Sequence, residues 1–282
     1  MKMQIIKKVK APVRIDFGGG TTDISPFKDK YGGAVLNAAI NKYVVGKLIA
    51  DGKSTKLDYH ADIPTSSGLG TSSSMDVVWV ALITHHTNKE KIAEVVFNIE
   101  QAIKESSFNG KQDQYAAAFG GINFMEFKGD KVKITKLNLS ANLIKELEQK
   151  LVLVYVGPHF SGDSNKLAID NLKKGKNIRN LLRIKQIAYE MKNCLLNGNL
   201  VKFAELMNKE TEERSKLAKG IVSKKIEEII KKGMENGAIA AKVCGSGGRG
   251  SILFFGDKNK LKKKFGSKVI DFKFDFEGLK EI

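Results

Sequence analysis

Residues 64–74 read PTSSGLGTSSS and lead directly into MDVVWVALITHH. A flexible linker would use the same small polar residues, but apolar side chains would not follow it at helical spacing. Here Met75, Val78, Trp79 and Leu82 fall on one stripe at intervals of three, one and three residues. The stretch therefore predicts a loop that opens into a helix over about residues 73–86.

Residues 68–74, GLGTSSS, place backbone N–H groups and hydroxyls at the start of this helix. The unpaired amides of a first helical turn and the helix dipole both favour an anion there. The stretch is not a Walker phosphate loop, because no GK[ST] follows. Two readings stay open at this point, a phosphate-binding loop or a plain serine-rich helix cap.

The composition indicates a packed globular protein. The chain has 282 residues, of which 42% are apolar, so one large or two ordinary domains are possible. No apolar run reaches the roughly 18 to 20 residues of a membrane span, and the first residues lack a signal-like pattern. Cys194 and Cys244 provide neither a disulfide framework nor metal-ligand spacing. We therefore expect a cytoplasmic protein that does not bind a membrane.

The formal charge of +17 arises from 48 basic and 31 acidic residues. Such an excess suits a nucleic-acid surface or a pocket for polyanionic small molecules. Most of it is lysine in stretches such as KKGKNIRN and DKNKLKKKF, which are also typical of solvated helix faces. The charge alone therefore does not indicate a nucleic-acid partner, and we expect none.

The patterns along the chain predict a mixed α/β protein. Strand-like runs occur at KVKAPVRIDF, YVVGKLIA, INFMEF and KLVLVYVG, and AVLNAAINK is a separate short apolar stretch. Helical periodicity covers about residues 89–107 and much of 166–236, and VIDFKFDF is a final strand candidate. We place a domain change near residue 150, which divides the chain into residues 1–150 and 151–282.

Two more glycine-rich segments resemble binding loops. PVRIDFGGGTTD at 12–23 puts an arginine on a strand before three glycines and Asp23, although a tight turn with a structural aspartate would look alike. GSGGRGS at 245–251 lies between an apparent helix and the strand SILFF, and suits a backbone-lined concavity or a hairpin turn. Each segment is a weak signal by itself.

Together and in this order, the three segments resemble the signature motifs of the GHMP kinases, the superfamily of galactokinase, homoserine, mevalonate and phosphomevalonate kinases. The resemblance covers nearly the whole chain. It is greatest to the sugar-kinase branch represented by D-glycero-D-manno-heptose 7-phosphate kinases, through FGGGTTD, YGGAVLNAAINKYV and GKQDQYAAAFGGINFMEF. It implies a two-domain α+β fold, with an N-terminal half like ribosomal protein S5 domain 2 and a ferredoxin-like C-terminal half.

The resemblance implies a nucleotide and metal site at the middle loop. It assigns ATP phosphate binding to Pro64, Ser67, Gly68, Leu69, Gly70, Thr71, Ser72 and Ser73. Ser72 and Glu100 match the family's magnesium ligands, and Mg²⁺ prefers such hard oxygen ligands. The apolar stripe Ile92, Val95, Val96, Ile99 and Ile103 leaves Glu100 at its edge, where the alternative is an ordinary solvated carboxylate.

The resemblance also implies the catalytic and acceptor residues. Asp113 matches the catalytic aspartate, which can accept the proton of the attacking hydroxyl, and Arg14 matches the basic residue beside it. Asp23 matches a galactokinase aspartate that binds sugar hydroxyls, but Gly20 and Thr21 replace the Glu-His pair found there. This departure argues against galactose and suggests open space for a bulkier acceptor. The remaining acceptor-binding residues implied are Gly245, Ser246 and Gly247.

We therefore predict an ATP- and Mg²⁺-dependent kinase, monomeric or homodimeric, that phosphorylates a sugar or sugar phosphate. The best single candidate is the anomeric hydroxyl of D-glycero-D-manno-heptose 7-phosphate. The alternatives are an isoprenoid-pathway kinase, such as mevalonate or phosphomevalonate kinase, and a catalytically silent sugar sensor. Arg249 stands where the third motif usually has glycine, and either contacts a phosphate or points to solvent.

Overall fold

The structure is a computed structural model that describes residues 4–51, 53–64, 66–84, 86–103, 109–158, 161–245 and 247–282. Within these ranges the strands form two separate antiparallel sheets. The larger sheet has the order β10-β1-β2-β4-β5, with β3 also paired to β2, and the smaller one has the order β7-β8-β6-β9. No helix in the described part of the chain is long and apolar enough to span a bilayer.

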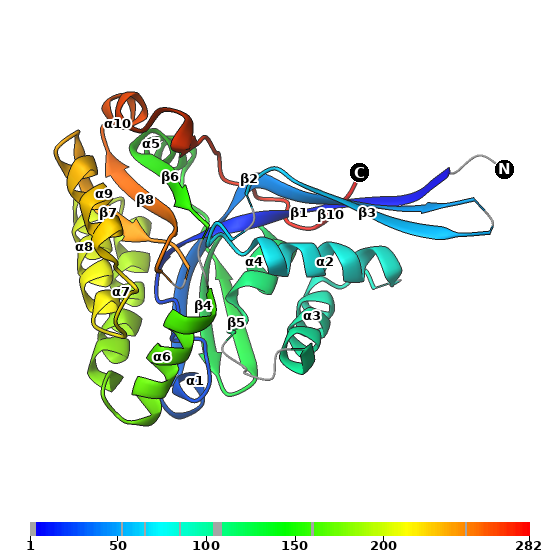
Figure 1. Ribbon diagram of the computed structural model, residues 1–282, viewed down its shortest axis with the longest axis horizontal. Coiled ribbons are helices and arrows are strands. Elements are labelled where there is room, and N and C mark those ends of the chain that lie inside the picture. The colour runs from blue at the N-terminus through cyan, green and yellow to red at the C-terminus, as the bar shows by residue number, and fades with distance from the viewer. Residues whose placement is uncertain are drawn as a thin grey trace.

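The larger sheet extends beyond the body as a long arm of β1, β2 and β3 (Figure 1). Its strands are β1 (Gln4–Gly18), β2 (Gly33–Ala50), β3 (Thr55–Ala61), β4 (Ile122–Lys128), β5 (Lys131–Lys136) and β10 (Lys280–Glu281). Residues 33–40 of β2 are all buried, as expected for a strand covered on both faces, whereas most of residues 41–50 are only partly buried.

Two helices from the first half of the chain pack on β1 and β2 of this sheet, α2 (Thr71–Ile83) and α4 (Gln112–Phe119), and α3 (Lys89–Ile103) packs on these two helices. The short α1 (Phe27–Tyr31) lies beside β4. Helix α2 lies close to β2 at Gly46, where a Cβ would be 2.5 Å from Val78 Cγ1. The predicted helix at 73–86 is thus present and begins two residues earlier.

The smaller sheet consists of β6 (Leu151–Gly157), β7 (Ala238–Val243), β8 (Gly250–Gly256) and β9 (Val269–Ile270). Its helices are α5 (Ala141–Lys150), α6 (Ser161–Lys173), α7 (Ile178–Leu196), α8 (Leu200–Ser215), α9 (Lys224–Met234), α10 (Lys258–Phe265) and the 3₁₀ turn η1 (Gly266–Lys268). Apolar residues of α7 recur at Leu181, Ile184, Ile187, Met191 and Leu195, and all are buried.

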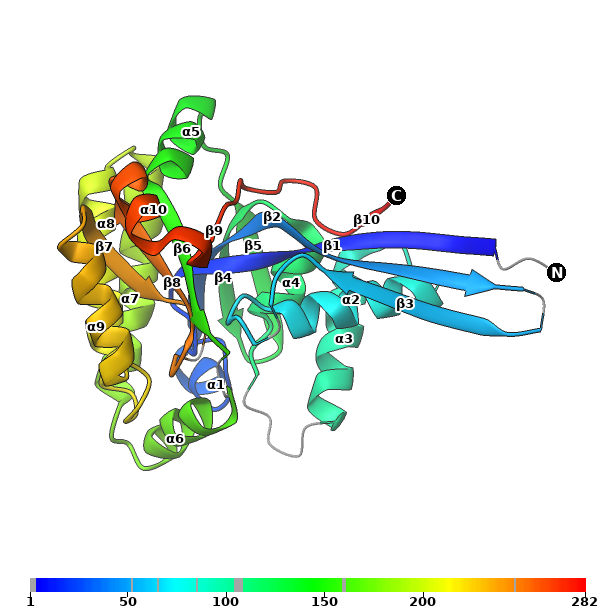
Figure 2. The ribbon, with the colours of Figure 1, turned by 45° about the horizontal axis from the view of Figure 1, so that its top comes forward.

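Helices α7 and α8 join the two sheets (Figure 2). Helix α7 packs on β1 and β2, and α8 packs on β7. One apolar core accordingly contains residues of both sheets and both helices, for example Ile15, Met191, Phe203 and Leu253. The division at residue 150 stays a prediction; β6 begins at Leu151, but β10 returns to the edge of the first sheet.

Four sequence expectations about local structure are wrong. AVLNAAINK is not separate from YVVGKLIA, because both run through β2 and pair with β1. VIDFKFDF forms a strand only at Val269–Ile270, since its Phe272 and Phe274 turn into the shared core instead. The segment before GSGGRGS is strand β7, not a helix, so this loop joins two antiparallel strands. Met75 is 42% exposed and lies off the buried face of α2.

Candidate active site

Strand β1 carries Arg14 and Asp16 two residues apart, so both side chains leave the same face of the sheet. Arg14 is buried, and its Nε and Nη2 donate to Asp113 Oδ1 and Oδ2 at 2.7 and 2.9 Å. This two-point contact fixes the orientation of both groups. Arg14 Nη1 also donates to the carbonyl of Gly68 at 2.7 Å. Arg14 therefore holds the middle glycine loop and helix α4 together.

Asp113 lies in the first turn of α4, and the residue before that helix is anchored. Lys111 Nζ donates to both carboxylate oxygens of Glu94, on α3, at 2.8 and 2.7 Å, and to the carbonyl of Asp130 at 2.9 Å. Lys111 is itself buried. The position of Asp113 is thus fixed both by Arg14 and by the start of its own helix.

The loop before α2 leaves the first turn of that helix open toward the cleft. Its N-cap residue is Gly70, in the left-handed region at φ 73°, which has no side chain to cap the helix. The plain serine cap considered from the sequence is therefore wrong. Free first-turn amides and the helix dipole suit phosphate oxygens. A Cβ on Gly70 would lie 3.3 Å from the Asp113 carboxylate, which places the loop against the catalytic candidate.

Glu100 is 3% exposed, which excludes the solvated-edge reading of this residue. Its Oε1 accepts from Ser73 Oγ at 2.7 Å, and its Oε2 accepts from Asn109 Nδ2 and Gln114 Nε2 at 3.1 and 2.9 Å. Ser72, the other predicted metal ligand, is exposed and lines the same cleft. A hydroxyl and a carboxylate beside this open helix start fit Mg²⁺, which takes few protein ligands and completes its shell with water and phosphate oxygens.

Asp23 follows the glycine turn and is 1% exposed. Gln112 N and Nε2 donate to its Oδ2 and Oδ1 at 3.2 and 3.4 Å. A Cβ on Gly110 would lie 1.7 Å from Asp23 Oδ2, so only glycine permits this close approach. Burial, together with the nearby charge of Asp113, raises the pKa of Asp23 to about 6. The carboxylate is therefore poorly solvated and suited to accept hydrogen bonds from a ligand hydroxyl.

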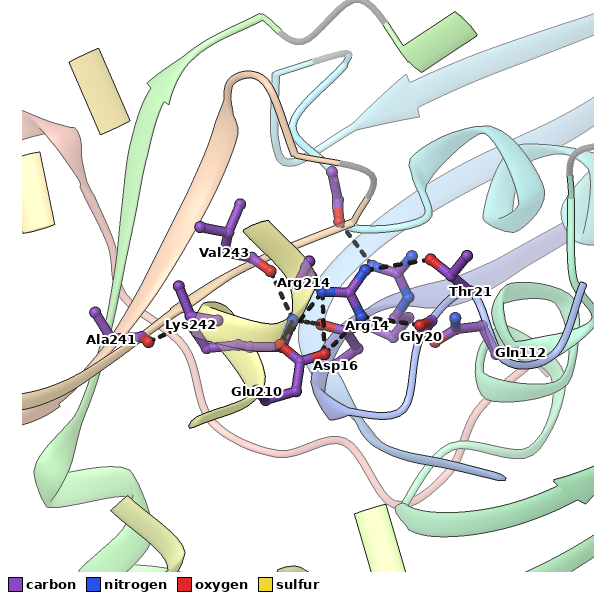
Figure 3. A network of polar contacts seen from close by, with 12 residues as sticks. Arg14, Asp16, Gly20, Thr21, Gln112, Glu210, Arg214, Ala241, Lys242 and Val243 are labelled. Carbon is purple, nitrogen blue, oxygen red and sulfur yellow. Dashed lines mark hydrogen bonds and ion pairs between the residues drawn. The ribbon is translucent and has the colours of Figure 1, made fainter. Parts of the chain in front are cut away.

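A buried charge network lies beside Gly20 and Thr21 (Figure 3). Arg214, on α8, forms an ion pair with Glu210 at 2.5 Å and donates to the carbonyl of Gly20 at 2.9 Å. Lys242, on β7, lies 3.0 Å from Asp16 and 3.2 Å from Glu210. All four ionic side chains are at most 2% exposed. Burial alone would raise the pKa of Asp16, but the charges of Lys242, Arg214 and Arg14 outweigh it and hold that pKa below its usual value.

The structure brings most of the predicted site residues together around one cleft of about 350 Å³. Its lining includes Arg14, Gly20, Thr21, Asp23, Ser67, Gly68, Gly70, Thr71, Ser72, Ser73, Glu100, Asp113 and Gly245. Gly245 meets the middle loop, because a Cβ there would lie 2.9 Å from the Gly68 carbonyl oxygen.

A few predicted residues lie elsewhere. Pro64 is exposed outside the lining, Leu69 is buried in the apolar core, and Gly247 packs against Ile221. Ser246 lies outside the described residues. Arg249 is exposed and is not part of the lining.

Two family models match the chain, the GHMP kinases N terminal domain at residues 34–121 and the GHMP kinases C terminal model at 191–271. The D-glycero-alpha-D-manno-heptose 7-phosphate kinase of Campylobacter jejuni is 30% identical, over 97% of this chain and 98% of that protein. The chain belongs to the GHMP kinase family. The family, the α+β fold and the enzyme class predicted from the sequence are thereby confirmed.

Solved GHMP kinases share the whole fold. A D-glycero-D-manno-heptose 1-phosphate kinase from Bacteroides thetaiotaomicron is 25% identical, with a TM-score of 0.75 and 98% of each chain covered. Lactococcus lactis galactokinase is 15% identical, with a TM-score of 0.72 over 98% of this chain and 94% of that one. The second likeness concerns the fold alone.

In this GHMP kinase, the sequence reasoning missed Asp16, Glu210, Arg214 and Lys242. It also expected open space at Gly20, and this expectation is wrong. A Cβ at Gly20 would lie 2.6 Å from Asp16 Oδ2 and 3.1 Å from Arg214 Nη2. The small residue thus lets the charge network contact the turn and does not leave room for a bulkier acceptor.

Asp23→Asn is expected to stabilise the fold at alkaline pH. The folded pKa of Asp23, about 6, exceeds the ordinary aspartate value of 3.8, so stability falls as pH rises between these values and the full cost is present above pH 6. Asparagine resembles the protonated carboxyl and avoids that cost. Urea unfolding should show little difference from wild type at pH 4 and a gain on the order of 2 kcal/mol at pH 8. A variant less stable than wild type at pH 8 would contradict this reading of Asp23.

Proposed function

We propose that this GHMP kinase transfers the γ-phosphate of ATP to a sugar phosphate, with D-glycero-D-manno-heptose 7-phosphate as the acceptor and its anomeric hydroxyl as the target. The observation that carries the proposal is the arrangement in one cleft of an open helix N-terminus, the Arg14–Asp113 pair and the buried Asp23. Two relatives that cover nearly the whole chain are named for phosphorylated heptoses, which supports the acceptor class.

In this proposal, the middle loop binds ATP, the phosphate donor. Backbone amides at the start of α2, with the helix dipole, would hold the β- and γ-phosphates. Ser72 and Glu100 would hold Mg²⁺, whose charge neutralises phosphate oxygens when the ion is bound. Phosphoryl transfer depends mainly on positioning and electrostatic stabilisation, so a rigid loop against Asp113 is the relevant feature.

In the same proposal, Asp23 and Asp113 contact the hydroxyl groups of the acceptor. Asp23 would accept a hydrogen bond from a sugar hydroxyl and so orient the ring. Asp113 would take the proton of the attacking hydroxyl, while that oxygen bonds to the γ-phosphorus and the bond to the ADP oxygen breaks. Arg14 keeps both Asp113 oxygens in a fixed orientation, 2.7 and 2.9 Å from its nitrogens.

The acceptor's phosphate has no dedicated cation among the described lining residues. Arg14 and Arg214 line the cleft, and both already pair with carboxylates. The overall charge of +17 can add to a preference for an anion, because it acts over distance, and this contribution is screened by salt. This makes salt dependence an informative part of the test.

The test compares kcat/KM for galactose, mannose and D-glycero-D-manno-heptose 7-phosphate at two salt concentrations, with the product position read by phosphorus NMR. We expect at least a tenfold preference for the phosphorylated acceptor over galactose, because a pocket with unmatched polar groups discriminates strongly. Added salt should lower kcat/KM for the phosphorylated acceptor, and removal of Mg²⁺ with EDTA should abolish turnover. Galactose turnover equal to that of the heptose phosphate would contradict the proposal, and a preference without salt dependence would exclude charge steering.

A further inference from the structure

The turn between β1 and α1 is held in a strained conformation. Thr21 has φ 75°, and a β-branched residue in this region is an uncommon, costly arrangement. Thr21 and Thr22 are both buried. Thr22 Oγ1 donates to the carbonyl of Gly19 at 2.7 Å and lies 3.0 Å from that of Ala34, which secures the side of the turn that faces β2. The turn ends at Asp23, the proposed acceptor ligand.

The other side of the turn is held by Arg214 from the second half of the chain. Its Nη2 donates to the Gly20 carbonyl at 2.9 Å, and its Nη1 donates to Thr21 Oγ1 at 3.3 Å. Thr21 is the strained residue, and Gly20 directly precedes it. Figure 3 shows the guanidinium directed at Gly20 and Thr21, away from the smaller sheet.

The rest of the network fixes Arg214 in that direction. Glu210, one helical turn earlier on α8, accepts from its Nε and Nη2. Lys242 bridges Glu210 to Asp16, so two positive and two negative side chains balance in the interior. A planar, forked guanidinium can satisfy Glu210, Gly20 and Thr21 at once, whereas a lysine ammonium has one nitrogen and cannot span them.

We propose that Arg214 is a positioning residue for the acceptor, because it clamps the strained Gly20–Thr21 turn and thereby fixes Asp23. The inference rests on the proposed function, in which Asp23 binds a hydroxyl of the acceptor. A hydrogen bond to a charged group contributes about tenfold or more to binding affinity, so release of this turn should weaken binding of the acceptor to Asp23. A purely structural network would stabilise the fold without affecting the acceptor selectively.

The test uses Arg214→Lys, which keeps the charge balance but loses the fork. Two amides report on the turn directly, since Thr22 N donates to Gly19 O and Ile24 N donates to Thr21 O, at 3.1 and 3.3 Å. Their hydrogen exchange should accelerate at least about tenfold in the variant, while exchange in β6 stays unchanged. The KM for heptose 7-phosphate should rise about tenfold, with the KM for ATP and kcat within about twofold of wild type.

Arg183→Lys is the matched control. Like Arg214, Arg183 forms an ion pair with a carboxylate of its own helix, in this case Glu190 on α7. Unlike the Arg214 pair, this pair is partly exposed. It should change neither the exchange of the turn nor either KM. Unchanged exchange in Arg214→Lys overturns the inference, and so does faster exchange with an unchanged acceptor KM.

Thr21→Gly provides a second route if Arg214→Lys does not fold. It relieves the strain and removes the Oγ1 contact without touching a buried charge. We expect an undiminished melting temperature, faster exchange of the turn and a raised acceptor KM, and normal exchange or KM overturns the inference. Wild-type protein that phosphorylates neither the heptose phosphate nor another sugar instead refutes the proposed function, and the exchange comparison still decides whether Arg214 holds the turn.

Discussion

Asp113→Asn is expected to lower kcat by about 10²-fold or more, within the usual range for loss of a general base. Asparagine keeps the size of the side chain and one acceptor oxygen for Arg14, but it cannot take a proton from the attacking hydroxyl. The KM for ATP should change little, because the glycine loop is held by the hydrogen bond from Arg14 to the Gly68 carbonyl, which the substitution does not remove. Steady-state kinetics on protein whose melting temperature matches wild type give the answer.

The control for this prediction is Asp130→Asn, the same chemical change on a carboxylate whose side chain is 99% exposed. It should leave kcat unaltered. If folded Asp113→Asn turns over at a near-normal rate, Asp113 does not act as the base, and positioning by Arg14 and the loop would have to supply the catalysis.

Lys242→Met is expected to destabilise the protein by about 3–5 kcal/mol, the usual cost of removing one partner from a buried ion pair. Methionine fills similar volume, but it leaves Asp16 without its ion pair to Lys242, at 3.0 Å, and removes one of the two cations beside Glu210. Urea unfolding at neutral pH measures the loss. Lys202→Met, in the exposed pair with Glu205, should have a much smaller effect, because solvent screens an exposed ion pair.

The double variant Lys242→Met with Asp16→Asn tests the cause. It removes one charge of each sign, so it should be more stable than the sum of the two single effects implies, by at least about 1 kcal/mol. Strict additivity would show that the Lys242–Asp16 ion pair does not contribute to stability.

The sequence was sufficient for the parts of the site that motifs carry. The GLGTSSS stretch predicted both the loop and helix α2, because local turn chemistry and helical periodicity agree there. The resemblance identified Arg14, Asp23, Asp113 and Glu100 as site residues. They come from four separate segments of the chain, and in the structure they line one cleft. Their catalytic, substrate and metal roles stay predictions until variants are measured.

The charge network was missed because lysine and arginine in a strongly basic chain look like solvated residues. A signal was nevertheless present on α8, where Phe203, Met207, Glu210 and Arg214 follow one another at intervals of four, three and four residues. All four are buried, so the two charged residues continue the apolar stripe of the helix. Lys242 likewise follows AIAA in β7. Charged residues in apolar register predict burial, but only tertiary structure identifies their partners.

The predictions for Met75 and for the VIDFKFDF segment were wrong for the opposite reason. The apolar residues there matched a regular pattern, but the tertiary structure does not follow it. Helix α2 buries Val77, Val78, Ala81 and Leu82 against the arm of the sheet, which turns Met75 outward. Phe272 and Phe274 fill the core between the sheets, so their backbone leaves strand geometry. In both cases, packing against elements distant in the sequence determined which side chains are buried.

The return of the chain's last residues to the first sheet affects how the protein is made on the ribosome. Lys280 and Glu281 pair with Lys10 and Val9, and Tyr43 donates to Asp275 at 2.9 Å. At about 5–20 residues per second, synthesis reaches them roughly 7 to 26 s after residue 150. Until then the nascent first half keeps this β1 edge unpaired, and an unpaired edge invites association with other chains. We therefore expect the nascent chain to need protection at this edge until residues 280 and 281 have been synthesised.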